Sequence, residues 1–248
     1  MKRLFISLLA LTAVAANAQT IVIGTKSNDL VLKVGPNNRL YQAYLGEKML
    51  NANDYENLAW NVYAASDGSV TTRGWEVYNT GGSEEYFEPA VAITHTDGNQ
   101  TTYLYYQGHE TKKVEGGTET VIRLADNQYP VNVTLHYIAY PEQDVIKTWS
   151  EISHNEKAVK AAKNIAPNGC ITLSAINTTM LYFRRPTYYL TEFSSDWAKE
   201  AQMSSQQLQY GKKIVDTKLG SRASMHTHPF FEVGLGAPVQ EQQGEVLM

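Results

Sequence analysis

Short runs in which apolar and polar residues alternate restrict the fold of this chain more than any other feature of its sequence. The clearest run covers residues 131–137 and reads VNVTLHY. A period of two places Val131, Val133, Leu135 and Tyr137 on one face of an extended strand. Runs of strand length, separated by turn residues, recur from residue 20 onwards. The sequence therefore predicts an all-β, antiparallel fold, a large β-sandwich.

The same reasoning gives boundaries for individual elements. We expect strands at 20–23, 30–34, 40–45, 90–96, 101–106, 121–124, 131–137, 145–153, 170–176, 212–218 and 230–235. Asp97-Gly98-Asn99 is typical of a hairpin turn, which would pair strand 90–96 with 101–106. Residues 170–176 read as a buried strand, and 158–168 as a loop and strand rather than a helix. A Ser cap followed by an acid predicts one short helix at 194–200.

Composition excludes several classes of function. The chain has 248 residues, a net charge of −4 and no basic run, which argues against nucleic acid and anionic membrane partners. Cys170 is the only cysteine, so no intrachain disulfide can form. No linker or repeat divides residues 19–248, and we expect one large domain there.

The first residues predict export. Lys2 and Arg3 precede an apolar run, and Ala16-Asn17-Ala18 has the A-x-A pattern of a cleavage site. The run is shorter than the ~20 residues of a spanning helix. We therefore expect residues 1–18 to be a signal peptide and no membrane span to remain after cleavage. A buried N-terminal helix is the alternative.

Candidate catalytic residues do not stand out by spacing. Glycoside hydrolysis needs two carboxyl groups about 5–10 Å apart. The acids of this chain offer no distinctive pair: Asp54, Glu76, Glu84, Glu85, Glu88, Asp144, Glu192 and Asp196. His226 and His228 would share a strand face, as in a metal site, but no third ligand is nearby and a polar sheet face is the simpler interpretation. No nucleophile elbow or phosphate loop is present, and we expect no cofactor or metal.

Aromatic content leaves two interpretations open. The 16 Tyr and 4 Trp suit stacking on sugar rings, but aromatic residues are also common in β-sheets. A polar, weakly patterned segment at 51–73 resembles a binding loop. Together these features favour a binding or supporting domain over a self-sufficient enzyme. A surface interaction domain without a sugar role is a third possibility.

Several segments, in order along the chain, resemble the N-terminal β-domain of glycoside hydrolase family 36 α-galactosidases. They are 87–98, 126–131, 140–146, 190–200, 220–231 and 244–246. The resemblance implies a β-supersandwich of the galactose-mutarotase type, packed against a catalytic (β/α)8 barrel. Two barrel aspartates would perform retaining hydrolysis of terminal α-linked galactose. Met248 precedes the barrel, so we expect a fragment that lacks its last sandwich strands and is inactive alone.

The resemblance also implies partners and contacts. In the family the N-terminal domain helps to wall the active site, in some members across a tetramer interface. On this basis Asp54, Arg73 and Trp197 are the candidate substrate-binding residues, and α-galactoside oligosaccharides, the enzyme's own barrel and further copies of the chain are the expected partners. The location would be the periplasm. The alternative is a stand-alone exported carbohydrate-binding β-sandwich.

Overall fold

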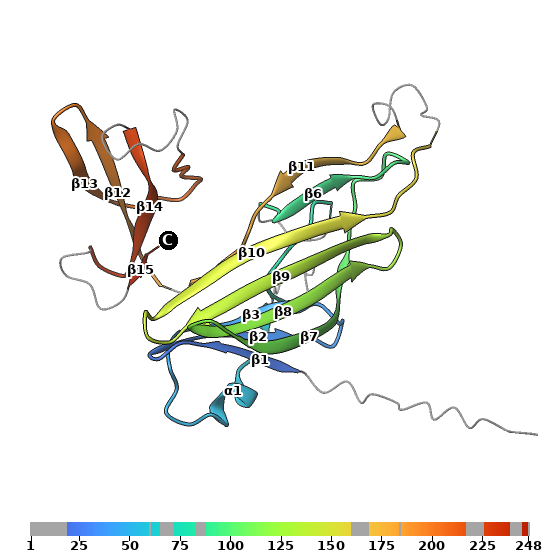
Figure 1. Ribbon diagram of the computed structural model, residues 1–248, viewed down its shortest axis with the longest axis horizontal. Helices are drawn as coiled ribbons and strands as arrows, with labels where there is room; N and C mark the ends of the chain where they lie inside the picture. The colour runs from blue at the N-terminus through green and yellow to red at the C-terminus, as the bar shows by residue number, and fades with distance from the viewer. Residues whose placement is uncertain are drawn as a thin grey trace, which may run out of the picture. The chain divides into compact units, whose positions relative to one another are not determined.

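The computed structural model describes residues 19–59, 61–64, 72–82, 88–159, 169–183, 185–216, 226–238 and 245–247 (Figure 1). These residues form strands β1 to β15 and one four-residue helix, α1. Every pairing between named strands is antiparallel. The all-β prediction with one short helix is confirmed. No helix in the described part of the chain is long and apolar enough to cross a membrane.

The chain divides into two compact units, and the boundary along the sequence lies between Tyr182 and Phe183. The first unit begins with a five-stranded sheet in the order β1-β2-β3-β5-β4. Its strands are β1 (Thr20–Gly24), β2 (Asn28–Val34), β3 (Leu40–Glu47), β4 (Asn61–Ala64) and β5 (Thr72–Glu76). A tight turn joins β2 and β3, since the Asn38 amide donates to the Gly35 carbonyl at 2.9 Å. Asn38 adopts φ 60°, a conformation that asparagine tolerates.

A four-stranded sheet in the order β10-β9-β8-β7 forms the second layer of this unit. It contains β7 (Leu104–Val114), β8 (Gly117–Asp126), β9 (Val131–Tyr140) and β10 (Val145–His154). In β9 the side chains of Val131, Val133, Leu135 and Tyr137 are buried, and those between them are more exposed. The alternating pattern therefore predicted the buried face of β9 correctly.

The core of the first unit lies between these sheets. Alternate residues of β2 meet alternate residues of β8 and β9, and Leu32, Ile122 and Leu135 are almost completely buried. Full burial of one such side chain contributes about 1.5–3 kcal/mol relative to exposure. Because the sequence offers no disulfide, this two-layer burial is the main source of stability. The arrangement is a β-sandwich.

One predicted hairpin is wrong. β6 (Val91–Thr94) does not pair with the chain that follows its turn; it pairs with β11 (Thr172–Ile176). The turn itself forms, because the His95 amide donates to the Asn99 carbonyl at 2.8 Å. Beyond it, β7 enters the other sheet and pairs along its length with β8. The long β7–β8 ladder offers many more backbone pairs than a four-residue partner could.

Strand β11 also differs from its prediction. It lies where expected, but Leu173 and Ile176 are 46% and 51% exposed, so it is not a buried strand. Among the described residues neither face of this strand is covered, since four of its five residues are exposed. Residues 160–168, most of the expected loop and strand before β11, lie outside the described part.

The second unit is a four-stranded sheet in the order β13-β12-β14-β15. Its strands are β12 (Tyr188–Asp196), β13 (Lys199–Gln207), β14 (His226–Leu235) and β15 (Glu245–Leu247). The strand expected at 230–235 is present in β14. The strand expected at 212–218 is wrong over residues 212–216, which have no strand pairing, and the remainder lies outside the described residues.

The helix predicted at 194–200 is also wrong, because these residues form the end of β12, a tight turn and the start of β13. Ser195 does not cap a helix; its Oγ accepts a hydrogen bond from the Ala201 amide across the hairpin, at 2.9 Å. Ala198 has φ 57°, outside the right-handed helical region. Pairing of β12 with both β13 and β14 outweighs a weak local capping signal.

Candidate functional site

The segment predicted as a binding loop, 51–73, contains regular structure. It begins with α1 (Asp54–Asn57) and continues into β4 and the first residues of β5. Asn51 orders the helix start, since its carbonyl accepts from the Asp54 amide at 3.0 Å and its Oδ1 from the Asn53 amide at 3.1 Å. Asp54 is exposed, and an acidic side chain is favoured in the first turn of a helix.

Tyr55 anchors this helix to the sheet beneath it. Its ring is buried, and its hydroxyl donates a short hydrogen bond to the Asp29 carboxylate of β2. The same hydroxyl accepts from the Met49 amide at 3.0 Å. Burial, and then the bond to Asp29, raise the pKa of Tyr55 above its ordinary value. The exposed Asp54 therefore directly precedes Tyr55, whose position is fixed by these hydrogen bonds.

The other two predicted site residues lie elsewhere. Arg73 is in β5, where its backbone pairs with Tyr63 of β4, and its side chain lies outside the described part. Trp197 is at the tip of the β12–β13 hairpin, in the second compact unit. The structure thus places Asp54 and Arg73 in one unit and Trp197 in the other.

In a helix at 194–200, Trp197 would pack on the sheet. In the structure it does not. Its side chain is 88% exposed, and its amide donates to Asp196 Oδ1 at 2.7 Å within the turn. An indole held outward on a two-residue turn offers its ring faces to a ligand or a protein surface. The exposed indole is the most prominent feature of the hairpin tip. The helix predicted at 194–200 gave no indication of this exposure.

The histidine pair of β14 takes part in the same hairpin. His228 Nε2 lies 2.7 Å from Ser195 Oγ, while His226 is exposed with φ 66°. Ser195 is 7% exposed and also holds the Ala201 amide, so its hydroxyl joins strands rather than facing a substrate. Among the described residues no group of three or more His, Cys, Asp or Glu side chains could hold a metal ion.

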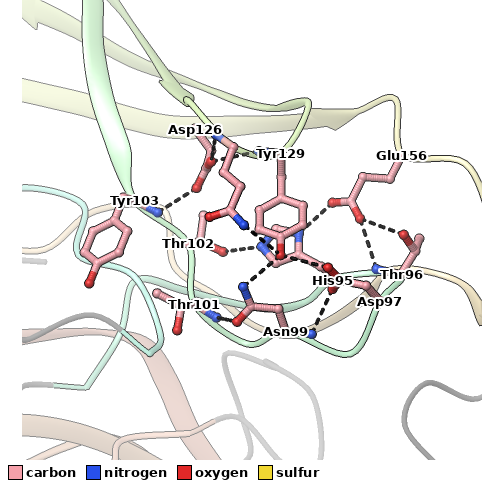
Figure 2. A network of polar contacts seen from close by, with 11 residues as sticks. His95, Thr96, Asp97, Asn99, Thr101, Thr102, Tyr103, Asp126, Tyr129 and Glu156 are labelled. Carbon is pink, nitrogen blue, oxygen red and sulfur yellow. Dashed lines mark hydrogen bonds and ion pairs between the residues drawn. The ribbon is translucent and has the colours of Figure 1, made fainter.

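A buried polar cluster joins three loops of the first unit, as Figure 2 shows. His95 Nδ1 lies 2.6 Å from Glu156 Oε1, and His95 Nε2 lies 2.9 Å from Thr102 Oγ1. An acid, a histidine and a hydroxyl in this order resemble a nucleophile with its base. However, His95 and Thr102 are 0% and 1% exposed, so no substrate can reach the hydroxyl. The cluster is structural.

Hydrogen bonds also set the charge state of this cluster. Burial opposes ionisation of Glu156, but donation from the Thr96 amide and from His95 outweighs it and lowers the pKa of Glu156. The pKa of Asp97 is lowered first by the Asn99 amide, and Tyr129 adds a hydrogen bond. Both carboxylates are therefore held in their ionised form.

The sequence placed His95 and Asp97 in the segment 87–98, as part of a strand and of a turn, but it did not reveal the partners of His95. Tyr129 follows β8, and its turn is fixed by Asp126, which accepts from the Tyr129 amide at 2.9 Å. Glu156 follows β10, far along the chain. The turn residues at 126–128 indicate the turn that carries Tyr129, whereas no local pattern in the sequence indicates Glu156.

The acids considered for catalysis mostly have structural contacts. Glu76 forms a buried ion pair with Arg39, Asp144 accepts from the Ser27 amide at 3.1 Å, and Glu192 lies 3.0 Å from the Lys213 ammonium. Glu84 and Glu85 lie outside the described residues.

Comparison with known proteins identifies what this arrangement is similar to. Residues 38–248 match the family described as the glycosyl hydrolase family 36 N-terminal domain. The chain is 27% identical over 180 residues to α-galactosidase C of Emericella nidulans, and 24% identical over 178 residues to a probable α-galactosidase C of Aspergillus flavus. Each alignment covers 66% of this chain but 22% of the relative.

Solved structures share the fold. The α-galactosidase from Lactobacillus brevis superimposes with a TM-score of 0.71 at 18% identity, over 89% of this chain and 31% of that one. A variant of the family 36 α-galactosidase AgaA from Geobacillus stearothermophilus, in complex with raffinose, gives 0.70 at 17% identity, over 87% and 31%. The chain thus spans under a third of these proteins.

Proposed function

Because the chain belongs to the glycosyl hydrolase family 36 N-terminal domain family, we propose that it is the non-catalytic N-terminal domain of an exported α-galactosidase. The match over residues 38–248 carries this proposal. The reaction would be retaining hydrolysis of terminal α-linked galactose. The domain would support and wall an active site that a separate (β/α)8 barrel provides.

The chemistry of the described acids supports this division of roles. Retaining hydrolysis needs two carboxyl groups about 5–5.5 Å apart, one of them able to donate a proton. Two acids whose side chains are nearly inaccessible, Glu76 and Glu156, are bound to Arg39 and His95. Hydrogen bonding lowers the pKa of Glu156, which is the opposite of what a general acid needs. The nucleophile and acid/base would therefore come from the barrel.

Substrate contacts are the second part of the proposal. Asp54 would accept hydrogen bonds from sugar hydroxyls, Arg73 would donate to them, and Trp197 would stack on a ring or on the wall of the pocket. Related crystal structures contain raffinose and stachyose, which makes such oligosaccharides the first substrates to test. A homo-oligomer, such as a tetramer, would let these residues reach the active site of another copy.

Export to the periplasm is the third part. The signal-like pattern of residues 1–18 supports it. N-terminal sequencing of protein from the periplasmic fraction should begin at Gln19. An intact Met1 in mature protein would contradict export.

The coding sequence after Met248 and the activity of the full-length product test the main proposal. We expect the reading frame to continue into a barrel, and the product to release galactose from raffinose. Turnover of a different sugar, with none of α-galactosides, would reject the substrate. The exposed Trp197 favours one alternative, a stand-alone carbohydrate-binding domain. A stop codon after Met248, with galactoside binding by the chain itself, would establish it.

A further inference from the structure

Strand β2 is buried on both faces, and its outer face carries two charges. Leu30, Leu32 and Val34 point into the core, whereas Asp29 and Lys33 lie on the other face with Val31 between them. Asp29 and Lys33 are 1% and 3% exposed. Figure 1 shows α1 beyond this sheet, on the side away from β8 and β9. The four-residue helix α1 therefore covers two charged side chains, at positions where apolar side chains could also be buried.

Lys33 binds the end of that helix. Its ammonium donates to the carbonyl of Glu56 at 2.8 Å and to that of Leu58 at 2.6 Å. These carbonyls are among those that a helix leaves without internal partners at its C-terminus. Burial lowers the pKa of Lys33, and the nearby Glu56 carboxylate opposes the effect.

Asp29 holds the start of the same segment. It accepts the hydroxyl of Tyr55, and that hydroxyl in turn accepts from the Met49 amide. Both anchors come from one strand, so residues 49–58 are fixed at two points. Burying an ammonium costs more free energy than burying an apolar side chain of the same size. Packing alone therefore does not account for Lys33.

The anchored segment presents its own side chains outward. Leu50 is 108% exposed, and Asn51, Asn53 and Asp54 are exposed as well. We propose that Lys33 is a positioning residue, which fixes α1 so that Asp54 meets a hydroxyl of the bound galactoside. This inference rests on the proposed function, and it adds a residue that would act on the sugar through α1 rather than directly.

The test uses the full-length protein with raffinose as substrate. Lys33→Met removes the ammonium and keeps most of the volume. We expect KM to rise about tenfold, equivalent to about 1.4 kcal/mol of binding, with kcat changed less than about twofold. Amide hydrogen exchange should become faster in peptides covering 49–59. Lys113→Met, an exposed lysine of β7, is the matched control and should leave KM unchanged.

A double variant separates positioning from general stability. If Lys33 acts through Asp54, adding Lys33→Met to Asp54→Ala should raise KM no further, because the two changes remove one interaction. Independent, multiplicative effects would overturn the inference. Should Lys33→Met fail to fold, Tyr55→Phe loosens the same segment and should show the same coupling to Asp54→Ala; an unchanged KM would overturn it equally.

The outcomes of these experiments distinguish the positioning role of Lys33 from the proposed function on which it rests. If the unaltered full-length protein cleaves no α-galactoside, the proposed function is wrong and the role of Lys33 falls with it. If the unaltered protein is active and Lys33→Met matches it in KM, only the positioning role is wrong.

Discussion

The imidazole of His95 is stacked on the phenol ring of Tyr129, with ring centroids 3.5 Å apart and planes 10° from parallel. Glu156 and Thr102 bind the two nitrogens of the same imidazole. One buried side chain thus connects the loop after β6, the β8–β9 turn and the loop after β10. A fully satisfied polar cluster of this kind specifies one arrangement of its loops.

The Glu156 carboxylate should stabilise the fold above acidic pH. Glu156→Gln leaves an amide NH2 facing groups that need an acceptor, so we expect a loss of about 1–3 kcal/mol in the free energy of unfolding at pH 7. Urea denaturation followed by circular dichroism measures it. The exposed Glu142→Gln is the control and should change stability by less than about 0.5 kcal/mol.

The same variant should flatten the dependence of stability on pH. The pKa of Glu156 is lower in the folded chain than its ordinary value of 4.5. Its contribution is therefore complete above pH 4.5 and disappears as the pH falls through the folded value. The two proteins should converge in stability at low pH. A constant difference between them from pH 7 to pH 3 would contradict the assignment.

The ion pair between Arg39 and Glu76 should matter far more than those on the surface. Glu76 Oε1 lies 2.9 Å from Arg39 Nε, and both side chains are nearly inaccessible. Glu76→Gln removes the carboxylate charge beside a buried guanidinium, and we expect a loss of about 3–5 kcal/mol in the free energy of unfolding.

The exposed pair of Glu110 and Arg123 provides the comparison. Its 3.0 Å contact joins side chains that are 59% and 49% exposed, so Glu110→Gln should cost about 0–1 kcal/mol. Chemical denaturation of both variants under one buffer condition gives the ratio. Equal losses would mean that burial does not control the strength of these pairs.

Trp197 should contribute to function without contributing to folding. Because its side chain is 88% exposed, Trp197→Ala should change the free energy of unfolding by less than about 0.5 kcal/mol. In the full-length protein the same change should raise KM for raffinose. Unaltered kinetics would exclude the hairpin tip from the sugar site, and a large loss of stability would show that the indole is buried in the assembled protein.

Local patterns predicted the sandwich well where burial alternates along a strand. Residues 131–137 are an example, since the alternation VNVTLHY directly reflects which side chains face the core. The pattern failed where pairing partners are distant. The turn after β6 has hairpin chemistry, yet β6 pairs with β11, and no property of residues 91–99 identifies that partner.

The candidate site was predictable only in outline. The polar character of residues 51–73 indicated an excursion from the sheet, which holds for α1 and the exposed Asp54 but not for β4 and the start of β5, which belong to the five-stranded sheet. The anchors of that segment, Asp29 and Lys33, were not predictable, because each occurs in a strand whose apolar residues dominate the pattern. Ser195 and Trp197 were assigned to a helix, since the capping signal is local and the strand pairing that overrides it is not.

Activity of the isolated chain tests the central claim most directly. Purified residues 19–248 and the full-length product should be assayed side by side, at equal molar concentration, for galactose release from raffinose. We predict that the full-length protein releases galactose and that the isolated chain releases none above the buffer blank. Release of galactose by residues 19–248 alone would contradict the account, because the carboxyl groups that break the bond would then lie within this chain.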